Sequence, residues 1–338
     1  MAHYNYKDKV IVITGATGGV GRATAHAFAA QGATIALIAR SQLQLEATKS
    51  EVEALGGQAI CIQADVADAS QVESAAETVE NTLGPIDVWV NNAMVSVFAP
   101  ISDISPDEYR RVTEVTYLGQ VYGTMAALRR MRPRDRGSIV LVGSALAYRG
   151  IPLQSAYCGA KHGIEGFYDS LRCELLHDHS HIKTCMVQLP AMNTTQFTWV
   201  LSRLPNKPKP MGKIYQPEVA ARAILYAAAH NRRSIWVGAS TYEAIIGNKL
   251  SPSYADSVLA RKGYKGQQTD QPGNNHRENN VWQPVHEDRG THGGFSQTSA
   301  RRSRTLWMAT HRGLLLTAAA LMLATSGLVK LISADNKN

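Results

Sequence analysis

The chain has 338 residues, enough for one main domain with appended segments and too few for several large domains. Hydrophobic residues make up 44% of it and charged residues 18%, which excludes a wholly disordered or collagen-like protein. The net charge of +8 arises from 35 Lys and Arg against 27 Asp and Glu. Because these charges are spread along the chain without a recognised binding motif, we expect no nucleic-acid partner.

The amino terminus, MAHYNYKDKV, has no apolar run before Val10 and predicts no secretory signal, so we expect synthesis to end in the cytosol. The four cysteines, Cys61, Cys158, Cys173 and Cys185, form no CxxC pair and no His/Cys metal spacing. We therefore expect a reducing compartment, no disulfide framework and no metal site.

Short apolar runs alternate with longer stretches of helical period. The run from Val10 to Thr14, a helical pattern to about Gln31 and the run from Ile35 to Ile38 form a βαβ opening. Further strands are expected at Ala59 to Gln63, Val88 to Val90, Ser138 to Val142, Thr184 to Leu189 and Ser234 to Val237. These runs are continuous blocks without polar alternation, as in strands covered on both faces. The sequence therefore predicts an α/β fold with a doubly wound parallel sheet of about seven strands.

A glycine-rich turn, TGATGGVGR over residues 14–22, follows the first strand directly. Residues without side chains let the backbone turn tightly and approach a pyrophosphate at a helix amino terminus. An ordinary glycine turn is the alternative, but a strand before and a helix after favour a dinucleotide site. The candidate cofactor-binding residues of this turn are Gly15, Thr17, Gly18, Gly19, Val20 and Gly21.

The second strand ends at Ile38-Ala39-Arg40-Ser41, without a carboxylate to bind a free ribose 2′-hydroxyl. Arg40, with Ser41 beside it, is suited to a 2′-phosphate, so the sequence favours NADP over NAD. The alternative is that Arg40 stacks on adenine and does not distinguish the two, since Gly18 supplies no second basic group.

Tyr157 and Lys161 are one helical turn apart, and Ser144 lies upstream at the end of a strand. A phenol has an ordinary pKa of about 10, and a nearby ammonium lowers that pKa by stabilising the phenolate. Tyr157 is therefore the candidate general acid/base, Lys161 its partner, and Ser144 a donor to the substrate oxygen. A YxxxK pattern alone occurs by chance on many helices, so the assignment depends on the glycine turn and Ser144 as well.

Over roughly residues 8 to 250, the chain resembles the short-chain dehydrogenase/reductase family. The resemblance rests on the glycine turn, on Asp65-Val66 and Asn91-Asn92-Ala93 after the third and fourth strands, and on the Ser144, Tyr157 and Lys161 set. It implies a Rossmann fold, an enzyme that uses NADP or NAD on alcohol or carbonyl groups, and a homo-oligomer. It also implies cofactor contacts at Asp65, Val66, Asn92, Ala93, Tyr157, Lys161 and Thr195.

Three residues depart from the family pattern. Thr116 stands where the family has a catalytic Asn, although its main-chain carbonyl could still hold a relay water. Met94 and Ala191 replace glycines and add bulk near the expected cofactor and substrate. These departures leave open a second hypothesis, a dinucleotide-binding sensor or scaffold with little catalysis.

The leading hypothesis is an NADP(H)-dependent oxidoreductase that moves hydride between nicotinamide and an alcohol or carbonyl carbon of a lipophilic small molecule. The loop from Ala191 to about Met211 is expected to shape the substrate pocket. Its apolar candidates are Met192, Phe197, Trp199 and Leu204.

The carboxyl-terminal part changes in composition. We expect an oxidoreductase domain over residues 1–255, a polar and partly disordered linker over 256–312 in which Val281, Trp282 and Phe295 could dock, and a candidate transmembrane helix over 313–332. Seventeen uncharged residues, 313–329, carry apolar side chains all round a helix, and arginines precede them at 301, 302, 304 and 312. The alternatives are membrane anchoring with the catalytic domain in the cytosol, or a helix packed on the domain or on a partner subunit.

Overall fold

The computed structural model describes residues 4–274, 277–313 and 317. Its centre is a sheet of seven parallel strands in the order β10-β7-β6-β4-β1-β2-β3. The strands are β1 Val10–Thr14, β2 Thr34–Ala39, β3 Gln58–Gln63, β4 Val88–Asn91, β6 Ser138–Ser144, β7 Lys183–Leu189 and β10 Ser234–Trp236. The predicted doubly wound parallel sheet is confirmed.

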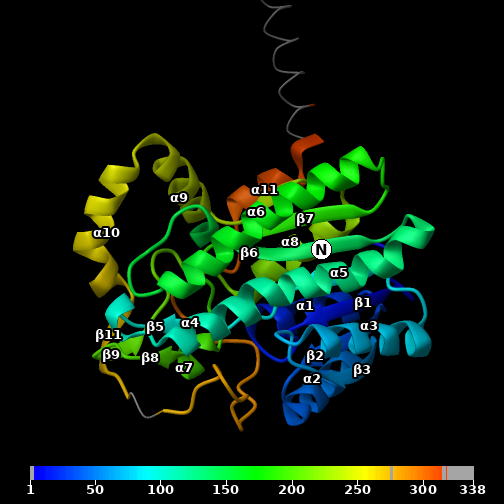
Figure 1. The fold of residues 1–338 in the computed structure, drawn as a ribbon, viewed down its shortest axis with the longest axis horizontal. Coiled ribbons are helices and arrows are strands. Elements are labelled where there is room, and N and C mark those ends of the chain that lie inside the picture. The colour runs from blue at the N-terminus through cyan, green and yellow to red at the C-terminus, as the bar shows by residue number, and fades with distance from the viewer. Residues whose placement is uncertain (1–3, 275–276, 314–316, 318–338) are drawn as a thin grey trace, which may run out of the picture.

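Helices cover both faces of the sheet (Figure 1). One layer contains α1 Gly19–Ala29, α2 Gln42–Ala54 and α8 Pro217–Ala229, and the other contains α3 Ala69–Leu83, α5 Gly119–Met131 and α6 Ser155–His177. Each layer has its own hydrophobic core against the sheet, with Phe28 and Ile224 in the first and Val72 and Ile164 in the second. Burial on both faces explains why the strand sequences are continuous apolar runs.

The strand order reverses next to β1, because β2 and β3 extend from one side of it and β4 and β6 from the other. Crossover helices leave the two sides of such a point in opposite directions and open a crevice at the carboxyl ends of the strands. The glycine turn after β1 and Asn92 after β4 both lie at this switch point.

The chain between β4 and β6 begins with β5 Val97–Phe98 and η1 Ile101–Asp103 and continues through α4 Pro106–Thr113 and the π-helical turn η2 Glu114–Leu118 into α5. Helix α4 starts with a capping box, in which Ser105 and Glu108 satisfy each other's backbone amides. The remaining short elements are η3 Arg132–Arg134, η4 Ala145–Ala147, α7 Gln196–Trp199, β8 Leu201–Ser202 and β9 Asn206–Pro208.

After the sheet, the chain forms α9 Ala239–Leu250 and α10 Pro252–Gly266, so the expected boundary at residue 255 falls inside a helix. Strand β11 Gln268–Pro272 pairs with β9, and α11 Arg304–Thr310 buries Leu306 against the α1/α8 layer. Between them, Val281 is fully buried and Val285 nearly so. The described residues of the expected linker thus pack on the domain, with Val281 and Val285 as buried side chains in a segment whose average composition is polar.

The candidate transmembrane helix over 313–332 lies almost entirely outside the described residues. Within the part of the chain that the structure describes, no helix is both long and apolar enough to cross a bilayer.

Candidate active site

A cavity of about 660 Å³ opens at the carboxyl ends of the strands. Its wall includes the glycine turn, the ends of β2, β4, β6 and β7, the first turns of α6, and parts of α9 and α10. This is the crevice that the strand order predicts, and most of the sequence-predicted site residues line it.

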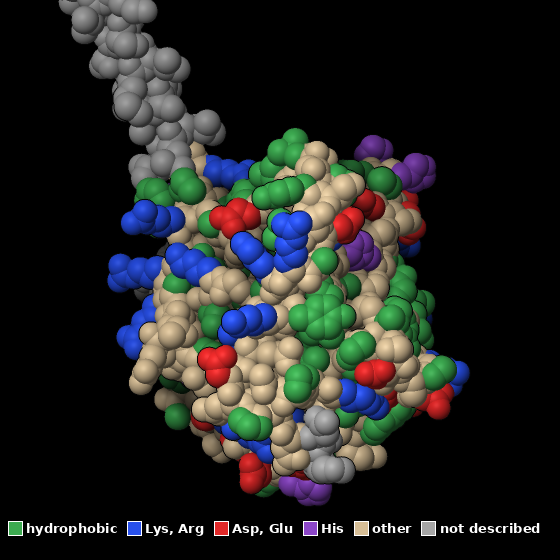
Figure 2. Space-filling view, turned by 90° about the vertical axis from the view of Figure 1, so that its left-hand side faces the viewer, with side chains coloured by type: hydrophobic (Ala, Val, Ile, Leu, Met, Phe, Trp, Pro, Cys, Tyr) green, Lys and Arg blue, Asp and Glu red, His purple; other side chains and the backbone are tan. Residues whose placement is uncertain are grey.

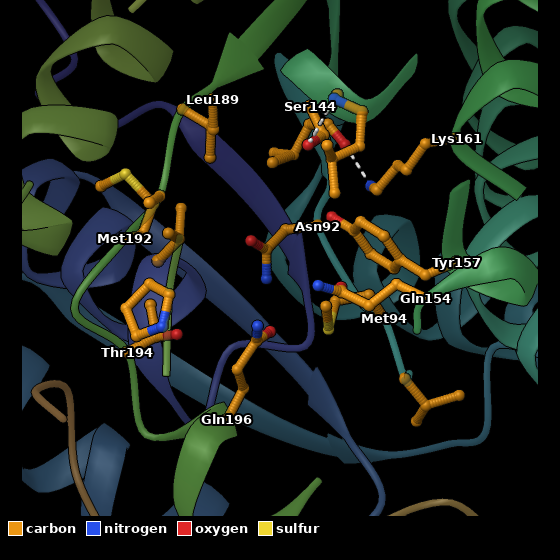
Figure 3. Close-up of a pocket in the computed structure, with 18 of the residues that line it drawn as sticks. Asn92, Met94, Ser144, Gln154, Tyr157, Lys161, Leu189, Met192, Thr194 and Gln196 are labelled. Atoms are coloured by element: carbon orange, nitrogen blue, oxygen red, sulfur yellow. Dashed lines mark hydrogen bonds between the residues drawn. The ribbon is translucent and has the colours of Figure 1, made fainter. Parts of the chain in front are cut away.

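Three of the four predicted catalytic residues, Ser144, Tyr157 and Lys161, meet in this cavity (Figure 3). Ser144 is the last residue of β6, and its hydroxyl accepts a hydrogen bond from the Leu146 amide at 3.1 Å. Tyr157 and Lys161 belong to α6, with the Lys161 Nζ 5.6 Å from the centroid of the Tyr157 ring. The ammonium donates to the Val142 carbonyl oxygen at 2.7 Å, which ties α6 to β6. The sheet and one helix therefore position all three groups.

Burial dominates the electrostatics of this trio. It raises the pKa of Tyr157, and a hydrogen bond with Ser144 opposes the rise without cancelling it. Burial also lowers the pKa of Lys161 to about 7, and no carboxylate among the described residues forms an ion pair with the ammonium to oppose this. The expected lowering of the Tyr157 pKa is therefore wrong for this geometry: removing water from the phenolate outweighs a lysine whose hydrogen bond goes to Val142.

The glycine turn fits against β4 with no room for side chains. Gly15 has φ +65°, and a Cβ there would lie 2.8 Å from the Ala93 Cα. A Cβ at Gly21 would lie 2.1 Å from the Gly15 carbonyl oxygen, so Gly21 packs beneath the turn and does not line the cavity. Asn92 donates to the carbonyls of Thr14 and Gly15 at 3.0 and 3.1 Å. The other predicted residues of the turn line the cavity: Gly15, Thr17, Gly18, Gly19 and Val20.

Helix α1 begins at this turn with no side chain capping its amino terminus. Uncapped amide groups at a helix amino terminus that faces a cavity suit an anion such as a pyrophosphate. The cradle therefore fits a dinucleotide.

Arg40, Asp65 and Val66 line the cleft where β2 and β3 end. We call this part of the cleft its adenosine end, after the contact that the family resemblance implies for Asp65. Asp65 forms an ion pair with Arg111 at 2.5 Å. The Arg40 guanidinium donates to the carbonyl oxygens of Asn280 and Trp282 at 2.5 and 3.0 Å. Arg40 is thus a half-buried cation whose hydrogen bonds go to neutral carbonyls in this structure.

Thr116 does not line the cavity. It is fully buried in the π-helical turn, and its hydroxyl donates to the Val95 carbonyl at 2.8 Å and accepts from the Val95 amide at 3.1 Å. Its side chain therefore fastens the loop after β4. Ala93, Met94, Ala191 and Thr195 all line the cavity.

Three of the four apolar residues predicted for the substrate pocket line the cavity. Met192, Phe197 and Trp199 line the cavity, with the Trp199 ring against Gly18 at the cofactor end. Leu204 does not line it, because this side chain is buried in a separate apolar cluster with Phe98 and Leu153.

Sequence reasoning missed the contribution of α9 and α10. Ala255, Val258 and Leu259 of α10 line the cavity, as do Ala244 and Gly247 of α9. The spacing of Ala255, Val258 and Leu259 is the i, i+3, i+4 pattern of a buried helix face, a signal that was present in the sequence. Val258 and Leu259 fall within 256–312, the range whose average composition predicts a linker.

Residues 9–203 match the short chain dehydrogenase family. An uncharacterized oxidoreductase of Bacillus subtilis, YxnA, is 33% identical over 297 residues, covering 86% of this chain and 83% of that protein. Dehydrogenase/reductase SDR family member 7B of Bos taurus is 36% identical over 175 residues, 50% of this chain and 54% of the relative. The 3-dehydrosphinganine reductase of Danio rerio is 35% identical over 170 residues, 49% of this chain and 51% of the relative.

The matched region contains the glycine turn, Ser144, Tyr157 and Lys161, and the match to YxnA extends over most of the chain. Together with the parallel sheet and the cavity at its switch point, these matches establish that this chain belongs to the short-chain dehydrogenase/reductase family of oxidoreductases.

Proposed function

We propose that the protein is an NADP(H)-dependent oxidoreductase that interconverts an alcohol and a carbonyl group on a lipophilic small molecule. The observation that carries this proposal is that Tyr157, Lys161 and Ser144 line one cavity together with the glycine turn.

A bound nicotinamide would supply or accept the hydride. In the reductive direction, the Tyr157 hydroxyl gives its proton to the substrate oxygen as that oxygen gains charge, and Ser144 holds the oxygen by a hydrogen bond. The Lys161 ammonium stabilises the resulting phenolate through the field of a nearby cation. The same residues act in reverse when an alcohol is oxidised.

The NADP preference is proposed from Arg40, a half-buried cation that lines the cleft where β2 ends. Replacing Arg40 with Asp should weaken NADPH binding by roughly 2 kcal/mol or more, because a charge-assisted contact is lost and the 2′-phosphate is repelled. Titration of the Arg40→Asp protein with NADPH and with NADH gives the ratio of the two dissociation constants. A change that weakens the binding of both dinucleotides equally leaves this ratio unaltered. An unchanged ratio would show that Arg40 does not select the phosphate.

The lipophilic substrate class is proposed from the walls of the cavity beyond Tyr157. Apolar side chains predominate there, including Leu146, Ile151, Met211, Val258 and Leu259. Such a wall favours apolar ligands with a single oriented polar group.

The decisive experiment is metabolite profiling of the purified protein with NADPH, scored by depletion that the Tyr157→Phe protein does not produce. Depletion of apolar carbonyl compounds supports the proposal, whereas turnover confined to sugars or phosphorylated compounds contradicts the substrate class. Dinucleotide binding without Tyr157-dependent turnover of any compound would instead favour the sensor or scaffold hypothesis.

We also propose that residues 313–332 anchor the protein in a membrane with the catalytic domain in the cytosol. The arginines at 301, 302, 304 and 312 are exposed, and Figure 2 shows basic side chains gathered where the described chain ends. Carbonate-resistant membrane association should disappear when residues 313–338 are deleted. A full-length protein that is wholly soluble without detergent would contradict anchoring.

A homo-oligomer is proposed through α5 and α6, the helix that follows Thr116 and the helix that bears Tyr157. Met125 of α5 and Leu176 of α6 are exposed apolar side chains that would be covered if these helices met those of a second copy.

A further inference from the structure

Residues 280–296, called the strap below, run along the cleft from its adenosine end to the loop that follows β7. They contain no regular helix or strand, yet Asn280, Pro284 and Val285 form part of the cavity wall. Three groups of contacts hold the strap in place.

The first group lies at the adenosine end. Val281 is fully buried in the core of the α3/α5/α6 layer. Its carbonyl accepts from Arg111 at 2.9 Å, while Arg40 donates to the carbonyls on either side of it. Gln44 of α2 donates to the carbonyls of Val285 and Glu287 at 2.9 and 3.0 Å. The strap thus occupies the hydrogen-bonding face of the arginine proposed to bind the 2′-phosphate.

The second contact is an ion pair beneath the glycine turn. Arg22 of α1 is 1% exposed and forms two hydrogen bonds to the Asp288 carboxylate, at 2.5 and 3.0 Å. The same guanidinium binds Glu51 and donates to the Thr17 carbonyl of the turn at 3.3 Å. One buried cation therefore links the strap to the proposed pyrophosphate site.

The third group lies on the loop after β7. The Asn193 side chain is fully buried, and its Oδ1 accepts from the Phe295 amide at 3.0 Å. The Gly293 amide donates to the Asn193 carbonyl at 3.2 Å, and the Asn193 Nδ2 donates to the Ser296 hydroxyl at 3.0 Å. Thr195, an expected cofactor contact, lies next to this attachment.

We propose that the strap is a clamp over the dinucleotide, and that its release from Arg22 and Asn193 controls how fast the cofactor enters and leaves. A 2′-phosphate that reaches Arg40 replaces the carbonyls of Asn280 and Trp282 on the guanidinium. The attachments at Arg22 and Asn193 are separate from this exchange and keep the strap over the bound cofactor. This inference rests on the proposed function, since it requires a dinucleotide in the cleft.

Two adjacent glycines provide a matched pair of variants. A Cβ at Gly293 would lie 2.4 Å from the Thr194 carbonyl oxygen and 3.0 Å from the Asn193 Oδ1, so Gly293→Ala must push the strap away from the loop. A Cβ at Gly294 meets nothing within 4 Å. The change in side chain is identical, but only the first variant disturbs the attachment.

Two adjacent acids provide a second pair. Asp288→Asn removes the charge that pairs with Arg22, while Glu51 remains to pair with this buried cation. Glu287 has a side chain that is 77% exposed and pairs only weakly with Arg289, so Glu287→Gln is the matched control.

The experiment measures NADPH dissociation from the full-length protein by stopped-flow fluorescence, with excess NADP⁺ as the competitor. Gly293→Ala and Asp288→Asn should each raise the dissociation rate by about tenfold, because charge-assisted or backbone contacts that hold the closed strap are lost. Gly294→Ala and Glu287→Gln should stay within about twofold of the wild type. Equal rates in all five proteins would overturn the clamp.

Hydrogen exchange of the wild-type protein gives a second readout that does not depend on a variant folding. Saturating NADPH should slow amide exchange over residues 280–296 more than over the exposed face of α10, since the clamp closes on its ligand. Unchanged strap exchange with bound NADPH contradicts the clamp alone. Failure of the wild type to bind NADPH or NADH contradicts the proposed function instead.

Discussion

Replacing Tyr157 with Phe should lower kcat by roughly 10²–10⁴-fold, the usual contribution of a positioned general acid or base. The substitution removes one oxygen and leaves a ring of nearly the same shape in a half-buried position. The cavity and the glycine turn are untouched, so the dissociation constant for NADPH should remain within a few-fold of the wild-type value. Steady-state kinetics with a substrate found by profiling, together with NADPH titration, measures both quantities.

Tyr168 provides the matched control on the same helix. It is buried, and its hydroxyl donates to the carbonyls of Thr184 and Arg233 at the far side from the cavity. Tyr168→Phe should therefore reduce stability and leave kcat nearly unchanged. Equal losses of kcat in the two variants would assign the Tyr157 effect to packing and not to proton transfer.

Replacing Lys161 with Met should abolish most turnover and at the same time stabilise the fold. The lysine is 2% exposed and its ammonium has no carboxylate partner, which is why burial lowers its pKa from 10.5 to about 7. A buried unpaired cation is costly, and a methionine fills similar space without charge. We expect the free energy of unfolding to rise by at least about 2 kcal/mol at pH 6.5.

The free energy of unfolding of the wild-type protein should depend on pH through Lys161. Above about pH 10.5, Lys161 is neutral in the folded and the unfolded chain and has no charge-related cost. As the pH falls from 10.5 to about 7, only the unfolded chain takes up the proton, so wild-type stability decreases. Below about pH 7 both states are protonated and the cost is complete.

Denaturant unfolding of wild type and Lys161→Met across this pH range measures the difference. The advantage of the variant should be largest below pH 7 and should shrink toward pH 10. Lys262→Met, at an exposed position of α10, is the control and should show no such trend. A pH-independent difference for Lys161→Met would mean that packing alone separates the two proteins.

Much of this protein was predictable from local patterns. The seven strands are continuous apolar runs because helices cover the sheet on both sides. The glycine turn, Ser144 and the Tyr157/Lys161 pair could be located because their chemistry depends on short spacings along a strand end or one helix turn. These residues meet in one cavity because parallel strands bring their carboxyl ends to a common edge.

Other features depend on contacts between distant parts of the chain. Arg22 and Asp288 are 266 positions apart in the sequence, and Arg40 and Trp282 are 242 positions apart. No local sequence spacing therefore predicts either contact. Leu204 was expected in the pocket from its hydrophobicity, but hydrophobicity does not specify which apolar cluster a side chain joins. The pKa of Tyr157 was expected to fall from its distance to Lys161, whereas the direction depends on how much water the fold removes.

The sequence by itself therefore determined the sheet and located the glycine turn and the candidate catalytic trio, since periodicity and motif spacing encode them within short stretches of chain. Only the tertiary structure decided which residues enclose the cleft: α9 and α10 at the substrate end and the strap at the adenosine end. The physical reason is that a segment covers the cleft through a few specific contacts with distant residues. Burial of Val281 and Val285 and the ion pair of Asp288 with Arg22 hold a segment whose average composition is polar.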